Sequence, residues 1–379
     1  MKLALFFTFG VSLERWVQQG LFDREKLLYE ELLKRRSLSD VFWLTYGSSD
    51  KSVAEELKKS GKLSAGIQVL SMPAFFNFPF GKFIYSLLLP IVYKKVLRQT
   101  DVLMTNQMSG SWAAVIAKKL YKKTLIIRTG YTLSSFLKKR PGAKLRAAVA
   151  GFTEKIAYKN ADVAVVASRD DKDYICSTHK IWQQKINVFG NYIDTDTFKP
   201  IDCEKYSDRI VFVGRLTSQK NLFNLFDAIS KTSFILDIYG QGELHNELEQ
   251  KAKELNMQVN FMGVVPNKEL PMILNHYRYY ILPSLYEGTP KTLLEAMACG
   301  LVCIGTNAAG INEVVIDGVN GCLAGDIDSN SIFYAIQRAK KTSENSITNS
   351  AVETIRTGYS LENVVKKYAD LLRSIKNVS

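Results

Sequence analysis

Short apolar runs alternate with helical patterns along the whole chain. Most of the runs are continuous rather than alternating, which is typical of strands that are buried on both faces of a parallel sheet. The runs predicted to be strands are 3–9, 41–46, 67–71, 102–105, 125–128, 163–167, 210–214, 235–239, 259–262, 280–283 and 302–306. Because helical patterns lie between them, we predict two successive series of β-α-β units and therefore an α/β protein with two Rossmann-like domains.

A polar stretch separates the two series. It reads NYIDTDTFKPID and carries Pro200, so we predict a first domain at 1–190 and a second at 191–360. The remainder, 361–379, is predicted to be a helix that begins after Ser360 as N-cap and packs back on the first domain. Its apolar face is formed by Val364, Val365, Tyr368, Leu371, Leu372 and Ile375.

Two apolar stretches have features of segments that enter or contact a membrane. The first run ends at Glu14-Arg15 without a small-residue cleavage site, so we interpret it as a strand rather than a signal peptide. The second, 72–93, never reaches the ~20 apolar residues of a spanning helix. It is rich in Phe and leads into Lys94-Lys95 and Arg98, which favours contact with a membrane interface. An ordinary helix packed on a sheet is the alternative.

Composition places the chain among globular proteins. Its 379 residues are 46% hydrophobic and 23% charged, which excludes disordered and collagen-like classes. The five Cys are odd in number and form no C-x-x-C pair, which argues for a reducing compartment and against a disulfide scaffold. Cys176 and His179 form one C-x-x-H without a second pair, so no zinc site is expected.

The positive charge lies in the first half. Residues 1–190 carry 31 Lys and Arg against 15 Asp and Glu, a formal charge of +16, whereas the rest of the chain carries −3. A region with this positive charge is suited to bind an anionic membrane surface, a phosphorylated substrate or a nucleic acid. No zinc finger or aromatic RNA-binding signature is present, so we expect no nucleic-acid partner.

The first stretch with chemical character is VGRLTSQKN. A strand ends at Gly214, and Arg215 and Lys220 follow it, where ligands of open α/β sheets bind. Arginine grips phosphate oxygens with two hydrogen bonds, and lysine adds a point charge. A helix is predicted to begin near Ser218, and its dipole disfavours a nearby cation. An anion site therefore explains Lys220 better than a surface position does. A second βα turn, at Gly240 and Gly242, is a weaker signal.

The second stretch is EGTPKTLLEAMACG. Gly288 allows close approach of a backbone, Thr289 is predicted to be the N-cap and Pro290 the first helical residue. The amides of that helix start would point at an anion. Glu287 lies in the preceding loop. Glu295 lies within the helix, where a solvent-facing position or a bond to ligand hydroxyls would each explain it.

Together these motifs resemble the retaining, nucleotide-sugar-dependent glycosyltransferases of family four. The resemblance implies the GT-B fold, with two Rossmann-like domains facing a central cleft. It covers 190–325 and includes GNYIDTDTFKP, GRLTSQKN, EGTPKTLLEAMACG and AAGINEVVIDGVNG. The stretch 105–131 looks like bacterial members that build cell-surface polysaccharide.

The resemblance implies three catalytic residues. Arg215 and Lys220 look like the pair that holds the donor diphosphate and stabilises it as it leaves. Glu287 looks like the glutamate that contacts hydroxyls of the donor sugar.

It also implies donor contacts. Glu295 looks like the residue that binds the ribose hydroxyls, and Gly10 matches more loosely the glycine that faces the diphosphate. The other expected donor-binding residues are Gly214, Gly288, Thr289 and Pro290.

The first domain departs from the family pattern. Many members place a His near the reacting sugar, where this chain has Arg128-Thr-Gly-Tyr131. Arg128 and Tyr131 are weak candidates for contacts with acceptor or phosphate, and a buried structural arginine is the alternative. Asp194-Thr-Asp196 has a D-x-D spacing but lies in the link between domains, so we expect no metal and no cofactor.

The expected protein is a metal-independent hexosyltransferase. It would move a sugar from a UDP or GDP sugar to a hydroxyl of a lipid-linked saccharide in cell-surface polysaccharide synthesis. We expect it in the cytoplasm, peripheral on the inner face of the cell membrane. A nucleotide-sugar epimerase would explain the second half but not the apolar, basic first half. A donor-binding pseudoenzyme that serves as a peripheral membrane scaffold is a further alternative, and the presence of both Arg215/Lys220 and Glu287/Glu295 counts against it.

Overall fold

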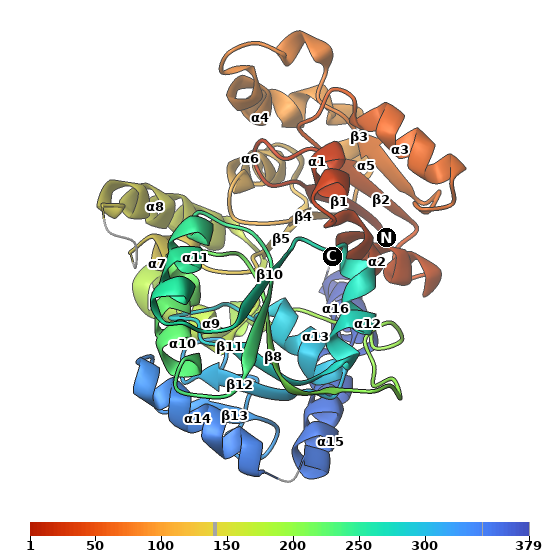
Figure 1. Ribbon diagram of the computed structural model, residues 1–379. Helices are drawn as coiled ribbons and strands as arrows, with labels where there is room; N and C mark the ends of the chain where they lie inside the picture. Colours follow the sequence, from red (N-terminus) through yellow and green to blue (C-terminus); the bar gives the residue numbers. More distant parts are fainter. Residues whose placement is uncertain (139–141, 343, 379) are drawn as a thin grey trace. The chain divides into compact units, whose positions relative to one another are not determined.

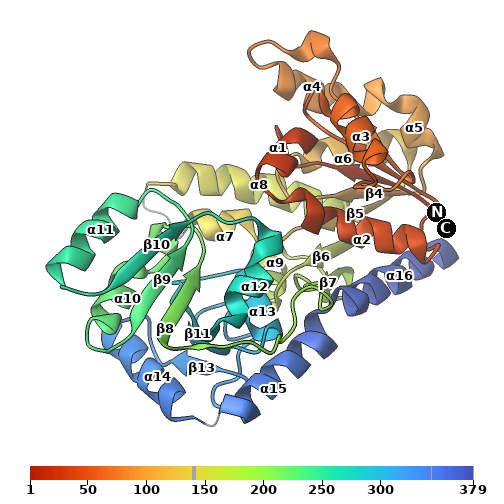
Figure 2. The same ribbon diagram turned by 45° about the vertical axis from the view of Figure 1, so that its right-hand side comes forward.

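The computed structural model describes residues 1–138, 142–342 and 344–378, which fold into two compact units (Figure 1). Unit 1 comprises Met1–Phe189 and Val365–Ser379, and unit 2 comprises Gly190–Val364. Figure 1 and Figure 2 show helices on both faces of the sheet in each unit. Each unit therefore has the layered α/β architecture that the alternating pattern predicts.

Within its described residues, unit 1 has a seven-stranded parallel sheet with strand order β3-β2-β1-β4-β5-β6-β7. The strands are β1 (Lys2–Phe6), β2 (Asp40–Leu44), β3 (Ile67–Leu70), β4 (Val102–Thr105), β5 (Thr124–Arg128), β6 (Val163–Val166) and β7 (Ile186–Val188). Leu3 pairs with Val41 on one side and Val102 on the other. The strand order reverses between β1 and β4, so their carboxyl ends border the crevice where such sheets bind ligands.

Crossover helices connect these strands, as parallel pairing requires. They are α1 (Leu13–Gln18), α2 (Phe22–Lys34), α3 (Asp50–Lys59), η1 (Ala74–Phe76), α4 (Gly81–Val92), α5 (Lys94–Gln99), α6 (Ser111–Tyr121), α7 (Leu133–Lys138), α8 (Lys144–Asn160), α9 (Arg169–His179) and η2 (Gln183–Lys185).

The described part of unit 2 contains a six-stranded parallel sheet with strand order β10-β9-β8-β11-β12-β13. The strands are β8 (Tyr206–Val213), β9 (Ile235–Tyr239), β10 (Val259–Gly263), β11 (Tyr277–Leu282), β12 (Val302–Thr306) and β13 (Cys322–Ala324). The order reverses between β8 and β11, which places a second switch point where these two strands end.

The helices of unit 2 cover the apolar core of this sheet. They are η3 (Ser218–Lys220), α10 (Leu222–Ile229), α11 (His245–Glu254), η4 (Asn267–Glu269), α12 (Leu270–Asn275), α13 (Lys291–Ala298), α14 (Ser329–Lys341), α15 (Glu344–Thr354) and the π-helical η5 (Ile355–Tyr359). The helix expected near Ser218 begins as the 3-10 turn η3, and the α-helix starts after Asn221, whose backbone is left-handed.

The last helix, α16 (Leu361–Val378), returns the chain to unit 1 from Val365 onward. The amide of Asn363 donates to Ser360 Oγ at 3.3 Å, which is the expected cap. Tyr368 is buried, and its ring centroid lies 5.0 Å from that of Phe189. The apolar stripe read from the sequence is therefore a packing face.

All the predicted runs form strands, but β7 and β13 were not predicted. Both have three residues and lie at the edge of their sheet. A strand this short has too few positions to show a hydrophobic period.

The apolar stretch 72–93 forms η1 and α4. The inner side of α4 packs on α6, where Trp112 Nε1 donates to Ser86 Oγ at 2.9 Å and Tyr121 Oη to the carbonyl of Pro90 at 2.8 Å. The outer side and the preceding turn expose Phe75, Phe78, Phe80, Phe83, Ile84, Leu87, Leu88, Ile91 and Val92. Ordinary packing thus accounts for only one side of α4. Within the described ranges, no helix is both long and apolar enough to cross a membrane.

Candidate active site

An ion pair joins the loops that follow β8 and β11. Lys220 Nζ lies 2.5 Å from Glu287 Oε1, and Ser284 Oγ donates to the same oxygen at 2.6 Å. The Lys220 and Glu287 side chains are only 12% and 10% exposed. The carboxylate therefore balances the cation whose position near a helix start is otherwise unfavourable.

Arg215 lies in the loop after β8, two residues beyond the end of the strand, and is exposed. Its backbone therefore lies at the end of β8, in the same loop region that leads to Lys220. The loops that carry Arg215, Lys220 and Glu287 thus lie at the end of the sheet where an anionic ligand is expected to bind.

Glycines allow the loops at this edge to touch. A Cβ at Gly240 would lie 1.8 Å from the carbonyl oxygen of Gly214, and one at Gly242 would lie 2.2 Å from that of Leu216. Leu216 also donates its amide to the carbonyl of Gln241 at 3.0 Å. The weak Gly-rich turn of the sequence therefore fixes the loop that carries Arg215.

Gly310 performs the same role for the loop that carries Glu287. It adopts φ +78°, and its Cβ would lie 1.6 Å from the carbonyl oxygen of Gly288. The amide of Glu287 donates to the carbonyl of Ala309 at 3.0 Å. Sequence reasoning gave Gly310 no role, although it lies in the matched AAGINEVV segment.

The start of α13 differs from the prediction by one residue. Pro290, with φ −73° and ψ 111°, is the N-cap, and Lys291 is the first helical residue. Thr289 is therefore not the cap, and across the described ranges no side chain caps α13. The carbonyl of Thr289 instead accepts from Asn191 Nδ2 at 2.6 Å. The helix ends at Ala298, and Gly300 follows in the left-handed region at φ +76°.

Glu295 lies inside the protein rather than facing solvent. It is 2% exposed, and Asn267 Nδ2 donates to its Oε1 at 3.1 Å. Burial and the nearby Glu295 carboxylate raise the pKa of the Cys299 thiol to about 12. A buried carboxylate of this kind needs hydrogen-bond partners, and hydroxyl groups of a ligand can serve as such.

Gly10 lies in the turn after β1 with φ +74° and open space around its Cβ position. The first amides of the short helix α1 are already bonded. Leu13 and Glu14 donate to the buried Asp50 carboxylate at 2.9 and 3.2 Å. Arg15 donates to Ser12 Oγ at 3.1 Å.

Arg128 is held by neighbours within unit 1. Its side chain is 13% exposed, Nη1 donates to Asn106 Oδ1 at 3.0 Å, and the same nitrogen lies 3.9 Å from Glu25 Oε2. Burial raises the pKa of Tyr368, and the adjacent Arg128 guanidinium opposes that shift. These contacts fit the structural alternative for this arginine. Tyr131 is more exposed, and its ring packs 4.8 Å from that of Phe136.

The D-x-D segment forms a turn. Asp194 accepts from the amide of Asp196 at 3.1 Å and from Thr197 Oγ1 at 2.7 Å. Among the residues that the structure describes, no group of three His, Cys, Asp or Glu side chains is arranged to hold a metal ion. All five cysteines are free thiols.

Two family models match the chain. One, described as glycosyl transferases group 1, matches residues 207–341, and the other, described as glycosyltransferase family 4, matches residues 28–197. Together with the two parallel sheets, these matches identify the class: the chain belongs to the family-four-like glycosyltransferases with the GT-B fold.

Individual proteins agree with this identification. The UDP-Gal:alpha-D-GlcNAc-diphosphoundecaprenol alpha-1,3-galactosyltransferase of Escherichia coli is 27% identical over 74% of this chain and 77% of its own length. The amylovoran biosynthesis glycosyltransferase AmsD of Erwinia amylovora is 28% identical over 74% of this chain and 80% of its own. HepE of Anabaena, solved in complex with UDP, has the same fold, with a TM-score of 0.76 at 17% identity over 99% of this chain and 100% of that one.

Proposed function

We propose that this protein transfers a hexosyl group, with retention of configuration and without a metal, from a UDP or GDP sugar to a hydroxyl of a lipid-linked saccharide. The product would serve cell-surface polysaccharide synthesis. The arrangement of Arg215 and the Lys220–Glu287 pair at the β8/β11 switch point carries this proposal. The names of the two relatives support the lipid-linked acceptor and the polysaccharide product, and the UDP complex of the structural neighbour supports the donor class.

The demanding step is departure of the nucleoside diphosphate from the anomeric carbon. Negative charge develops on that leaving group, and cations that are already in place stabilise it in the transition state. We assign this role to Arg215 and Lys220. Glu287 fixes Lys220 through their 2.5 Å contact, and its carboxylate also accepts hydrogen bonds from hydroxyls of the donor sugar.

We assign the nucleotide to the start of α13 and to Glu295. The diphosphate would meet the amides of this helix start, and the Glu295 carboxylate would accept from the ribose hydroxyls. The acceptor oxygen then forms its bond to the anomeric carbon as the bond to the phosphate oxygen breaks. The acceptor proton passes to the leaving phosphate, on the same face, which retains the configuration.

The decisive experiment incubates the protein with each nucleotide sugar and an undecaprenyl-diphosphate-linked saccharide. Formation of a longer saccharide whose new linkage has the donor's anomeric configuration by NMR is the expected result. Conversion of the sugar without acceptor would identify an epimerase. Nucleotide binding without any product would identify a pseudoenzyme.

We also propose that unit 1 attaches the protein to the cytoplasmic face of an anionic membrane. The exposed apolar side of α4 and the charge of +16 over residues 1–190 support this. Each basic residue at such a surface contributes roughly 1 kcal/mol. Flotation with anionic liposomes is expected at low salt and should weaken at high salt. Absence of co-flotation would overturn the attachment and leave the transferase proposal intact.

A further inference from the structure

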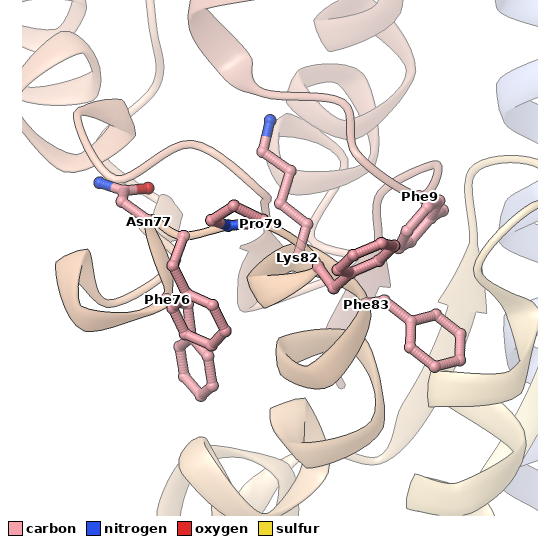
Figure 3. Close-up of a pocket in the computed structure, with 8 residues that line it drawn as sticks. Phe9, Phe76, Asn77, Pro79, Lys82 and Phe83 are labelled. Atoms are coloured by element: carbon pink, nitrogen blue, oxygen red, sulfur yellow. The ribbon is translucent and has the colours of Figure 1, made fainter.

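A hollow opens in unit 1 between η1, the start of α4 and the loop after β1. Its volume is about 510 Å³, within the range of small-molecule sites. Figure 3 shows the side chains that line it. Its lining is mainly aromatic, with one cation, and includes Phe9, Phe76, Phe78, Phe80, Lys82 and Phe83.

Phe80 occupies an unfavourable position in this wall. Its backbone is left-handed, with φ +65°, a region that bulky residues rarely adopt. The turn leaves little freedom, because a Cβ at Gly81 would lie 2.0 Å from the carbonyl oxygen of Phe76. Burial of the ring does not compensate for this strain, since Phe80 is 84% exposed. Strain that packing within the chain does not offset points to a functional role for the ring.

Lys82 gives the hollow an amphiphilic character. It is exposed and makes no hydrogen bond or ion pair within the described part of the chain. Figure 3 shows its ammonium group pointing away from the rings of Phe76 and Phe83. Aromatic walls beside a single cation suit a ligand with an apolar chain next to an anionic group.

The location favours the acceptor over a bilayer lipid. Phe9 belongs to the same loop as Gly10, which follows β1 at the switch point of this sheet. Ligands of open α/β sheets bind there. A surface that only attaches the protein to a bilayer has no reason to include this loop.

We propose that this hollow binds the acceptor's polyprenyl diphosphate, with the first isoprenoid units against the phenylalanine rings and a phosphate at Lys82. This inference rests on the proposed function, because it locates the lipid part of the lipid-linked acceptor. It assigns to Phe80 and Phe83 the recognition of the chain, and to Lys82 that of the charge.

The test measures the dissociation constant of undecaprenyl diphosphate for the full chain in detergent micelles, together with the KM for the undecaprenyl-diphosphate-linked saccharide. Phe80→Gly combined with Phe83→Ala is expected to raise both values about tenfold. Lys82→Ala is expected to raise the dissociation constant of undecaprenyl diphosphate about fivefold and to leave that of undecaprenol unchanged. Phe80→Gly relieves the backbone strain, so its melting temperature should not fall below that of the wild type.

Leu120→Ala is the matched control. Leu120 is an exposed apolar residue of α6 that lies outside both the exposed side of α4 and the lining of the hollow, so its substitution should change neither value. Unchanged binding in the Phe80/Phe83 variant would overturn the inference, even if that variant no longer floats with liposomes. A wild type that binds undecaprenyl diphosphate through these residues but transfers no sugar would overturn the proposed function alone.

Discussion

Lys220 and Glu287 are separated by 67 positions in the sequence, and their side chains meet at 2.5 Å. Each follows a strand next to the switch point of unit 2. Both side chains are largely buried, so each charge compensates the other where water is scarce. The pair fixes a cation at the end of the sheet, five residues after the exposed Arg215.

Removal of the Lys220 ammonium group should lower the catalytic rate more than it lowers the stability of the protein. We expect Lys220→Ala to lower kcat by about 10²-fold, because charge on the departing diphosphate loses its partner. Lys251→Ala is the control, since Lys251 also forms an ion pair, 2.7 Å from Asp227, but joins the helices α11 and α10 rather than the loops after the strands. Steady-state kinetics decide the matter: wild-type turnover in Lys220→Ala would remove Lys220 from the catalytic machinery.

Gly310 is expected to tolerate no side chain. Gly310→Ala places a methyl group against the carbonyl of Gly288 and should displace the loop that carries Glu287. Gly318→Ala isolates the backbone cost, because Gly318 has a similar φ of +73° but open space around it. Both variants should lose about 1 kcal/mol to the left-handed conformation, and only Gly310→Ala should also lose nucleotide binding. Thermal unfolding with and without nucleotide separates the two effects; equal behaviour would contradict the assigned role.

The nucleotide should be identifiable by thermal shift. A ligand at 100 times its dissociation constant adds about 2.7 kcal/mol of stability, so one of UDP, GDP, ADP and CMP is expected to raise the melting temperature. Glu295→Gln keeps the shape of the side chain but removes its charge, and it should reduce that shift. Glu249→Gln, on the surface helix α11, should leave it unchanged. A full shift in Glu295→Gln would argue against a ribose contact.

An acid-sensitive contact holds β13 in place. Arg338 Nη1 donates to Asp317 Oδ2 at 2.8 Å, and Asp317 Oδ1 accepts the amide of Leu323 at 2.7 Å. The hydrogen bond from Arg338 lowers the pKa of the Asp317 carboxyl. Its stabilisation is therefore present above the ordinary Asp pKa of about 3.9 and is lost as the pH falls through the lower folded value.

We expect Asp317→Asn to destabilise the protein by about 0.5 kcal/mol at pH 7, because the pair is half exposed. The difference should vanish in strong acid. Asp370→Asn removes an exposed pair with Arg373 that anchors no strand and should cost less. Denaturant unfolding over a pH series measures both variants, and a pH-independent difference would contradict the charge-based explanation.

The sequence revealed the strands that are buried on both faces, because their apolar runs are continuous. It did not reveal β7 and β13, which depend on a neighbouring strand rather than on their own pattern. β13 also depends on the Asp317–Arg338 contact, which no local signal in the sequence encodes.

The positions of Arg215 and Glu287 after β8 and β11 were predictable from the sequence, whereas their roles stay a proposal. Whether the Glu295 side chain points into the protein or toward solvent was not predictable. A single carboxylate on an apolar helix is compatible with either orientation until tertiary contacts select one. The cap of α13 was misplaced by one residue because Thr and Pro both favour helix starts, and backbone geometry decided between them. Gly310 was missed because its requirement arises from a loop 22 residues earlier in the chain.

Unit 1 is built from both ends of the chain, since α16 joins it from Val365 onward. During synthesis, unit 2 ends at Val364 and the rest of this helix follows it, so the unit that starts the chain finishes folding last. Until then Phe189, which packs against Tyr368, remains without this contact. A chain that lacks α16 would therefore combine a folded unit 2 with an incomplete unit 1.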